Sequence, residues 1–245
     1  MNWILLKSNE VEDGRARITD GRAQHICKVL RAEPGKTLRI GLLDGPFGSA
    51  TVLEVSTSLV LLDCTFESAL PPLPQVDLLL AMPRPKVLKR LWAQFAALGV
   101  GRIIITNAEK VERYYFDTHI LDSDFYTPRL IEGLQQAGDT QLPKVMIARY
   151  LKPFLKEELS NLFPENGKKV IADPSSPKTL LQTLGRPGLS SERRVLLAVG
   201  PEGGWTPSEL DLFRSEGFEL FGLGPRILRT DTACVALLGM LTALR

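Results

Sequence analysis

Hydrophobic residues follow two different rhythms along the 245-residue chain. Up to about residue 70, short apolar segments rich in Val, Leu and Thr alternate with turn residues, a pattern typical of β-strands. We predict strands at 38–43, 50–55 and 59–66 and one helix at 21–31, for which Asp20 is a candidate N-cap. Residues 1–70 are therefore expected to form a small domain that resembles a β-barrel.

Three prolines mark residues 71–75, a composition that favours an extended linker and a domain boundary. Beyond the linker, apolar segments of strand length alternate with amphipathic segments of helix length. Strands are predicted at 76–81, 102–106, 145–148, 169–172, 195–199 and 219–221, and helices at 86–98, 121–136, 153–162, 207–216 and 231–244. This alternation indicates an α/β domain over residues 76–245, built on a mostly parallel sheet that binds ligands beyond the carboxyl ends of its strands.

Composition says little about what the protein binds or where in the cell it works. The chain is 44% hydrophobic and 24% charged, and its net charge of +2 neither requires nor excludes nucleic acid. Cys27, Cys64 and Cys234 lack metal-ligand spacing and lie among apolar neighbours, so we predict buried, unpaired thiols in a reducing compartment. We find no signal-peptide pattern and no apolar run near the ~20 residues of a membrane helix. We expect a cytoplasmic protein that binds neither a membrane nor a metal.

Two loops that precede helices near the carboxyl end are candidate ligand-binding loops. Gly200–Trp205 follows a predicted strand and leads to Thr206, a candidate N-cap whose capping box Glu209 completes. Residues 223–230 follow the next strand and lead to the last helix, whose apolar body is expected to be buried in the core or in a subunit interface. Glycines let a main chain approach a ligand closely. The alternative for the first loop is a plain tight turn.

Charged residues in the two loops indicate which chemical class of ligand the loops can bind. Helix N-termini that hold phosphate use Lys or Arg, whereas the first loop offers Glu202, which suits a cationic or polyhydroxylated ligand. There is no Walker A motif, and Gly99-Val100-Gly101 stands in the wrong order for a dinucleotide fingerprint. Arg226 and Arg229 precede a helix that has little use for charge, with solvated or carbonyl-capping side chains as the alternative.

Together the segments VGPEGGWTPSEL (199–210) and LGPRILRTDTA (223–233) resemble the signature of the ribosomal RNA small subunit methyltransferase E family. That family methylates N3 of a uridine in 16S ribosomal RNA and belongs to the SPOUT class of S-adenosyl-L-methionine (AdoMet) enzymes. The segment 25–31 with Pro34-Gly35 resembles the family's PUA-like RNA-binding domain. The resemblance implies a deep trefoil knot in the carboxyl-terminal domain, AdoMet as cofactor, small-subunit ribosomal RNA as partner, and a homodimer.

The resemblance also implies roles for individual residues. The two loops would surround AdoMet, mainly through main-chain groups, with Glu202 tethering the loop or a ribose hydroxyl: Gly200, Glu202, Gly203, Gly204, Leu223, Gly224, Ile227, Leu228 and Thr230. Deprotonated uridine N3 would attack the sulfonium methyl in line, after the base has left its stack. A guanidinium near the uracil carbonyls would stabilise the anion, and Arg229 is the candidate catalytic residue. Phosphate contacts, with a solvated basic face as the alternative, are expected from Lys28, Arg31, Arg84, Lys86, Lys89 and Arg90.

Four positions on the substrate side depart from the family pattern: Gln94, Ala97, Gln135 and Asp139. At Asp139 an acid stands where the family has Arg. These departures keep two alternatives open, a catalytically silent RNA-binding or ribosome-assembly factor and an enzyme that methylates a different RNA. For the aromatic cluster 114–116 there are two alternatives: core packing, which is the expected role, and the stacking of bases.

Overall fold

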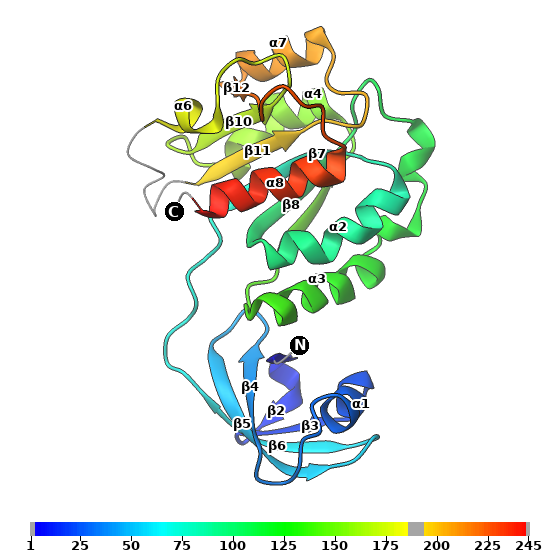
Figure 1. The fold of residues 1–245 in the computed structure, drawn as a ribbon, viewed down its shortest axis with the longest axis vertical. Coiled ribbons are helices and arrows are strands. Elements are labelled where there is room, and N and C mark those ends of the chain that lie inside the picture. Colours follow the sequence, from blue (N-terminus) through cyan, green and yellow to red (C-terminus); the bar gives the residue numbers. More distant parts are fainter. Residues whose placement is uncertain (1–2, 186–193, 244–245) are drawn as a thin grey trace. The chain divides into compact units, whose positions relative to one another are not determined.

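The computed structural model describes residues 3–185 and 194–243, which belong to two compact units (Figure 1). The first unit comprises Met1–Leu73 together with Ile131–Leu142, and the second comprises Pro74–Leu130 together with Pro143–Arg245. The domain limits predicted at residues 70 and 76 stay predictions.

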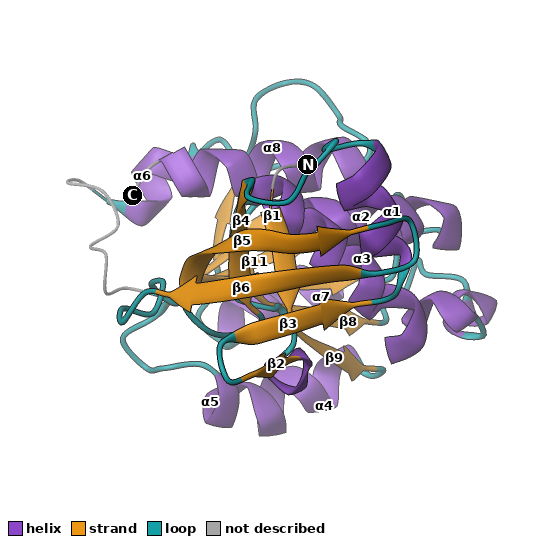
Figure 2. Ribbon diagram, turned by 90° about the horizontal axis from the view of Figure 1, so that it is seen from below, coloured by secondary structure: helices purple, strands orange, loops and turns teal. Residues whose placement is uncertain are grey.

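The first unit contains a curled six-stranded sheet (Figure 2). Its order is β1-β4-β5-β6-β3-β2, with β1 parallel to β4 and the other neighbours antiparallel. The strands are β1 (Trp3–Leu6), β2 (Val11–Glu12), β3 (Arg15–Ile18), β4 (Thr37–Leu42), β5 (Phe47–Val55) and β6 (Val60–Phe66). The three predicted strands are confirmed. The first three strands were not predicted, because they are short and β3 places Arg at every second position.

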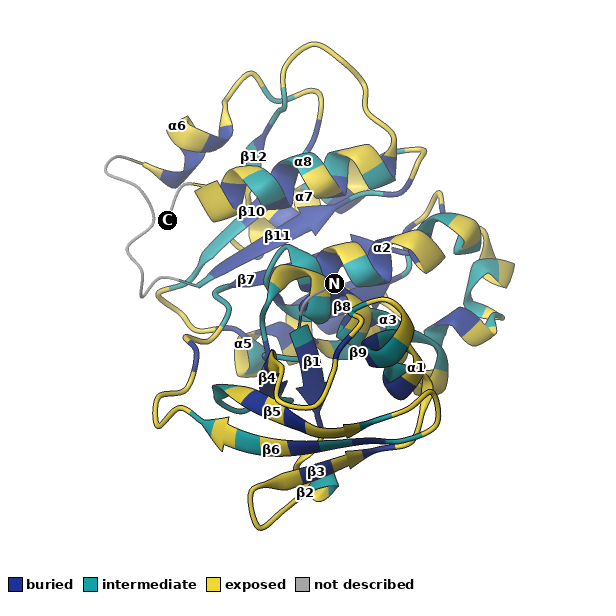
Figure 3. Cartoon of the chain, turned by 60° about the horizontal axis from the view of Figure 1, so that its bottom comes forward, coloured by how far each residue is buried: buried dark blue, intermediate teal, exposed yellow. Residues whose placement is uncertain are grey.

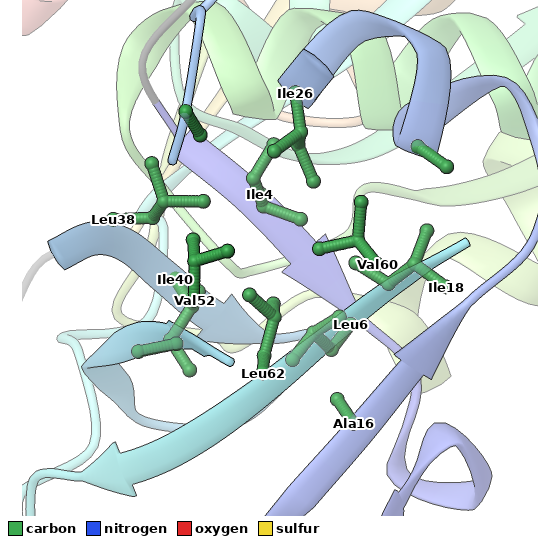
Figure 4. Packing of buried hydrophobic residues seen from close by; sticks show 13 residues of the cluster. Ile4, Leu6, Ala16, Ile18, Ile26, Leu38, Ile40, Val52, Val60 and Leu62 are labelled. Atoms are coloured by element: carbon green, nitrogen blue, oxygen red, sulfur yellow. The ribbon is translucent and has the colours of Figure 1, made fainter. Parts of the chain in front are cut away.

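Alternating burial along the strands builds the core of the first unit (Figure 3). Buried residues of β1, β3, β4, β5, β6 and a helix meet in one cluster, and Figure 4 shows among them Ile4, Ile18, Ile26, Ile40 and Leu62. The helix is α1 (Gly21–Lys28), and the Asp20 carboxylate caps it by accepting a hydrogen bond from Arg22 N at 2.9 Å, as predicted. It ends three residues earlier than expected, before Arg31, whose φ is 47°.

A six-stranded parallel sheet forms the centre of the second unit. Its order is β12-β10-β11-β7-β8-β9, and every neighbouring pair is parallel. The strands are β7 (Val76–Ala81), β8 (Val100–Thr106), β9 (Lys144–Ala148), β10 (Lys168–Ala172), β11 (Val195–Val199) and β12 (Glu219–Phe221). All six predicted strands are confirmed. Every residue of the central strands β7 and β11 is buried (Figure 3), which is typical of a sheet covered on both faces.

The helices agree with the predicted rhythm but differ in detail. They are α2 (Pro85–Ala97), α3 (Ser123–Ala137), α4 (Leu151–Pro153), α5 (Leu159–Leu162), α6 (Leu180–Leu184), α7 (Pro207–Ser215) and α8 (Thr230–Ala243). Short 3₁₀ turns occupy Ser8–Glu10, Arg113–Phe116 and His119–Leu121. The helix predicted at 153–162 is instead α4, one π-helical turn at Phe154–Glu158, and α5. Helix α6 was not predicted.

Helix α8 packs beside β11 and α2 (Figure 1). Cys234, Leu237, Leu238 and Leu241 are buried on one face. Val235 and Met240 are each 39% exposed within one chain, so burial of the whole helix body in a subunit interface stays a prediction. The predicted end of this helix at residue 244 lies outside the described residues.

Charged and thiol side chains add two further observations. Asp77 is fully buried in β7, and Arg194 pairs with both of its oxygens at 2.6 and 2.7 Å, which compensates the buried charge. All three cysteines are free, but only Cys234 is buried. The prediction of buried thiols is therefore wrong for Cys27 and Cys64, which are half-buried.

Among the residues that the structure describes, no helix has the length and apolar character needed to cross a bilayer.

Candidate functional site

A cavity of about 450 Å³ lies where β10, β11 and β12 end. Three loops line it, one after each strand, together with residues of α8; we call it the glycine-loop cavity. It brings together all nine residues predicted to surround a cofactor: Gly200, Glu202, Gly203, Gly204, Leu223, Gly224, Ile227, Leu228 and Thr230. The carboxyl edge of a parallel sheet is where open α/β folds bind ligands.

The loop after β11 is fixed by the helix that follows it. Thr206 caps α7 by accepting a hydrogen bond from Glu209 N, and the Glu209 carboxylate accepts one from Thr206 N at 2.8 Å. The predicted capping box is thus confirmed. The same carboxylate accepts a hydrogen bond from Glu109 N at 2.7 Å, so it also holds the segment that follows β8.

Glycine is required at specific points of the cavity wall. A Cβ atom on Gly200 would lie 3.0 to 3.2 Å from the Trp205 indole ring, closer than side chains usually pack. Gly204 and Gly224 adopt φ angles of 67° and 98°, which other residues rarely adopt. The loops therefore present main chain, not side chains, to whatever fills the cavity.

Two hydrogen bonds hold the glycine loop from outside. Arg84 N donates to Glu202 Oε1 at 3.1 Å, and Lys110 Nζ donates to Gly203 O at 2.8 Å. The first contact matches one of the two roles expected of Glu202, that of tethering the loop.

Polar groups that sequence reasoning missed also line the cavity. Asp173 is 8% exposed, and its Oδ1 accepts hydrogen bonds from Ser175 N at 2.9 Å and Ser175 Oγ at 2.5 Å. The Trp205 side chain is 5% exposed, and its Nε1 donor has no partner among the described residues. Asp173 directly follows a predicted strand, so its position at a carboxyl edge was a usable signal.

The two arginines of the second loop are placed differently. Both are exposed, but Arg226 lines the cavity and Arg229 is not part of the lining. Arg229 stands between two residues that do line it, and its carbonyl oxygen accepts a hydrogen bond from Ala233 N at 2.8 Å. Ile227, at the cavity, is 86% exposed, the highest exposed fraction among the large apolar side chains of the described residues.

The expected RNA-contact residues all lie on the surface. Arg84, Lys86, Lys89 and Arg90 gather at the N-terminal half of α2, whose first turn has no acidic residue. The helix macrodipole disfavours cations there, so local helix stability does not explain these charges. Arg90 pairs with Asp231 at 2.9 Å. The exposed Lys28 and Arg31 belong to the first unit: Lys28 ends α1, and Arg31 follows three residues later.

The positions that depart from the family pattern include one with a clear local role. The Asp139 carboxylate accepts hydrogen bonds from Thr140 N at 2.6 Å and Gln141 N at 3.1 Å, which stabilises the turn after α3. Gln94 is exposed, and Ala97 and Gln135 are half-buried. In the aromatic cluster, Tyr114 is 64% exposed, so the core-packing alternative is wrong for that residue.

No group of three or more His, Cys, Asp or Glu side chains in the described parts of the chain is arranged to hold a metal ion. The groups that the glycine-loop cavity offers to a ligand are main-chain groups, a few polar side chains and exposed apolar residues.

Comparison with known proteins identifies the class to which this sheet and cavity belong. Residues 71–242 match the family model described as RNA methyltransferase domain. The chain is 33% identical to the ribosomal RNA small subunit methyltransferase E of Treponema pallidum, over 96% of this chain and 88% of that protein. It is 28% identical to the ribosomal RNA small subunit methyltransferase E 1 of Borreliella burgdorferi, over 96% and 95% of the two chains. The chain belongs to the ribosomal RNA small subunit methyltransferase E family.

Solved structures agree with this assignment. The Legionella pneumophila protein Lpg2936, solved with the bound cofactor SAM, superposes with a TM-score of 0.77 at 26% identity, over 99% and 97% of the two chains. The ribosomal RNA small subunit methyltransferase E of Neisseria gonorrhoeae, bound to S-adenosyl methionine, gives 0.78 at 22% identity over 100% and 98%. The second likeness supports the fold alone.

Proposed function

We propose that this protein is an AdoMet-dependent methyltransferase of small-subunit ribosomal RNA that acts on N3 of a uridine. The observation that carries the proposal is the glycine-loop cavity, where nine residues expected from the family motifs meet at the carboxyl ends of three parallel strands. The relative from Legionella pneumophila, 26% identical, was solved with SAM bound.

The residues around the cavity fit AdoMet. Glycines at positions 200, 204 and 224 leave main-chain groups open to an adenine edge, and the unpaired Trp205 Nε1 offers one further donor. Asp173 and Glu202 provide carboxylates that suit ribose hydroxyls and a cation. A bound nucleoside would cover the exposed Ile227. AdoMet held here supplies a methyl group on a positively charged sulfur.

The chain's own residues have two further tasks in such a reaction. Uridine N3 is a poor nucleophile until its proton leaves, so a fixed guanidinium near the uracil carbonyls favours the anion. Arg229 is the proposed catalytic residue, and Arg226, which lines the cavity, is the competing guanidinium. The cations of α2, with Lys28 and Arg31, would contact phosphates and hold the base in place for attack.

We also propose the knot and the PUA-like domain that the family resemblance implies. Between β12 and α8 the chain passes against the loop after β10: Gly222 N donates to Lys178 O at 2.8 Å, and a Cβ on Gly222 would lie 2.6 Å from Ser176 O. This close crossing supports a threaded chain. The curled sheet of the first unit supports the PUA-like assignment. An experimental map in which the segment between β12 and α8 passes beside the loop after β10, and not through it, would contradict the knot.

A homodimer in the cytoplasm completes the proposal. Val235 and Met240, both half-exposed on α8, offer an apolar surface that a second copy would cover. We expect the purified protein to sediment as a dimer and Met240→Asp to shift it toward a folded monomer, with a thermal midpoint that no longer rises with protein concentration. A monomeric wild-type protein at micromolar concentration would contradict this part. Small-subunit ribosomal RNA is assembled in the cytoplasm of bacteria, which gives the expected location.

The experiment that tests the function uses the full-length protein, labelled AdoMet and small-subunit ribosomal RNA from cells that lack this protein. Nucleoside analysis by mass spectrometry should show N3-methyluridine in the treated RNA alone. AdoMet binding without transfer to free RNA or to assembled subunits would favour the silent assembly factor. Transfer to another nucleoside would show that the enzyme has a different target.

A further inference from the structure

A second cavity, of about 770 Å³, lies where β8 and β9 end. Its wall includes Asn107, Arg113, Tyr150, Lys152, Lys156 and Leu212, none of which the family motifs single out. We call it the basic cavity. We propose that it binds a nucleotide of single-stranded ribosomal RNA next to the methylated uridine, an inference that rests on the proposed function.

The charges at the wall favour an anion. Arg113, Lys152 and Lys156 are exposed, and none of the three head groups has an ion pair or hydrogen bond to a described residue. Two acids also line the cavity. The buried Glu209 carboxylate is already engaged by Glu109 N at 2.7 Å and Thr206 N at 2.8 Å, which leaves Glu109 as the one exposed carboxylate. Phosphate oxygens suit the remaining cations.

An exposed aromatic ring stands beside these cations. Tyr150 is 68% exposed at the cavity wall, and the buried Leu151 and half-buried Leu212 add apolar surface. Proteins that bind single-stranded RNA stack bases on such rings and track the backbone with cations. The combination therefore fits a nucleotide better than it fits a free phosphate.

The half-buried Asn107 gives the cavity an amide group that can read a base edge. Asn107 is the first residue after β8, and its Oδ1 is buried without a hydrogen-bond partner among the described residues. A carboxamide both accepts and donates, which matches the edge of a nucleobase. A buried acceptor without a partner is unfavourable until a ligand or water pairs with it.

The helix that carries the lysines is irregular at this place. Lys152 belongs to α4, and Lys156 belongs to the π-helical turn Phe154–Glu158 that follows it. Such turns are rare and frequently occur at functional sites.

The two cavities share one segment of the chain. Residues 199–205 line the glycine-loop cavity, and Ser208, Glu209 and Leu212 line the basic cavity. Both lie at the carboxyl edge of the same parallel sheet. An RNA strand whose target base reaches the methyl donor in the first cavity can thus place a neighbouring nucleotide in the second.

The test measures binding of labelled, deproteinised small-subunit ribosomal RNA to the full-length protein without AdoMet. Lys152→Ala with Lys156→Ala should weaken binding about tenfold at 0.1 M salt and reduce the slope of log affinity against log salt by roughly 1.4. Lys144→Ala with Lys178→Ala removes two exposed lysines of the same unit that do not line the cavity, and should change neither quantity. Equal losses in both pairs would overturn the inference.

Substitutions at Tyr150 separate stacking from charge. Tyr150→Ala should weaken binding at least about fivefold with an unchanged salt slope, and Tyr150→Phe should restore it because stacking needs only the ring. Asn107→Ala should weaken binding about threefold or more. All variants should bind AdoMet as the wild type does in calorimetry. Wild-type RNA affinity in both Tyr150→Ala and the cavity lysine pair would overturn the inference.

These outcomes are separable from the proposed function. A wild-type protein that transfers no methyl group but loses RNA affinity in the cavity variants would contradict the proposed function and support the basic cavity. A wild-type protein that methylates RNA while the cavity variants bind RNA normally would support the proposed function and contradict the basic cavity as an RNA-binding site.

Discussion

The two cavities at the carboxyl edge of the parallel sheet differ in the groups that line them: main-chain groups in one and long side chains in the other. Glycines and main-chain groups line the glycine-loop cavity, where added atoms would meet the Trp205 ring or force a strained backbone. Long side chains, namely Arg113, Tyr150 and Lys156, line the basic cavity. One site should therefore fail when atoms are added and the other when atoms are removed.

This difference follows from what each cavity is proposed to hold. A small cofactor of fixed shape is best held by rigid main-chain groups, because they lose little conformational entropy on binding. A flexible RNA strand with a repeating charge suits mobile, charged side chains. Substitutions in the glycine-loop cavity should therefore change methyl transfer or AdoMet affinity and leave RNA binding in the basic cavity intact.

The largest effect is expected from the arginine pair beside the glycine-loop cavity. Arg229→Ala should lower the rate of methyl transfer about 100-fold or more, because the uracil anion loses its electrostatic partner. AdoMet affinity should change less than threefold, since no described contact ties this side chain to the cavity wall. Single-turnover kinetics with Arg226→Ala as the matched variant measures this. A large loss in Arg226→Ala with a normal rate in Arg229→Ala would assign the role to Arg226.

The second-largest effect is expected from a substitution that adds atoms to the wall of the glycine-loop cavity. Gly200→Val places its Cβ within 3.0 to 3.2 Å of the Trp205 ring, so the ring or the loop must move. Overpacking costs about 1–3 kcal/mol, and we expect AdoMet affinity to fall roughly 10- to 100-fold while RNA affinity stays within twofold. Calorimetry and filter binding measure the two affinities. Gly21→Val is the control, because no atom lies within 4 Å of a Cβ added there.

A smaller effect on AdoMet affinity is expected when one hydrogen-bond donor of the cavity is removed. Trp205→Phe keeps an aromatic ring against Phe213, 4.8 Å away between centroids, but removes the unpaired Nε1 donor. If that donor pairs with AdoMet, affinity should fall about fivefold, the effect of one neutral hydrogen bond. Unchanged affinity with an unchanged thermal midpoint would show that the donor faces no polar atom of the cofactor.

The difference between the cavities also explains what the sequence could predict. Main-chain recognition uses glycines in short segments before a capped helix, and the resemblance of two such segments to the family signature implied the nine lining residues. Side-chain recognition in the basic cavity uses Asn107, Tyr150 and Leu212, which lie far apart along the chain and belong to no motif. Only the order of the strands brings them together.

The same reasoning applies to the fold. The strands of the parallel sheet are apolar runs bounded by turns, and all six were predicted; β7, β11 and β12 have the predicted limits. The strands β1, β2 and β3 were missed because a four-residue or two-residue segment carries almost no periodic signal. The π-helical turn was missed for a related reason: hydrophobic periodicity over 153–162 indicates a helix but does not reveal one additional residue in a turn.

The smallest expected effect tests a contact between the two sites. Lys110 Nζ holds Gly203 O at 2.8 Å across an exposed surface, so Lys110→Met should lower AdoMet affinity only about two- to fourfold. Methionine keeps the apolar stem that packs near Gly203, and Lys144→Met serves as the charge-matched control with no effect on the cofactor. A loss tenfold or greater would show that the glycine loop depends on this lysine for its shape. The main chain of the glycine-loop cavity would then not be rigid by itself, and the contrast between the two cavities would be weaker than proposed.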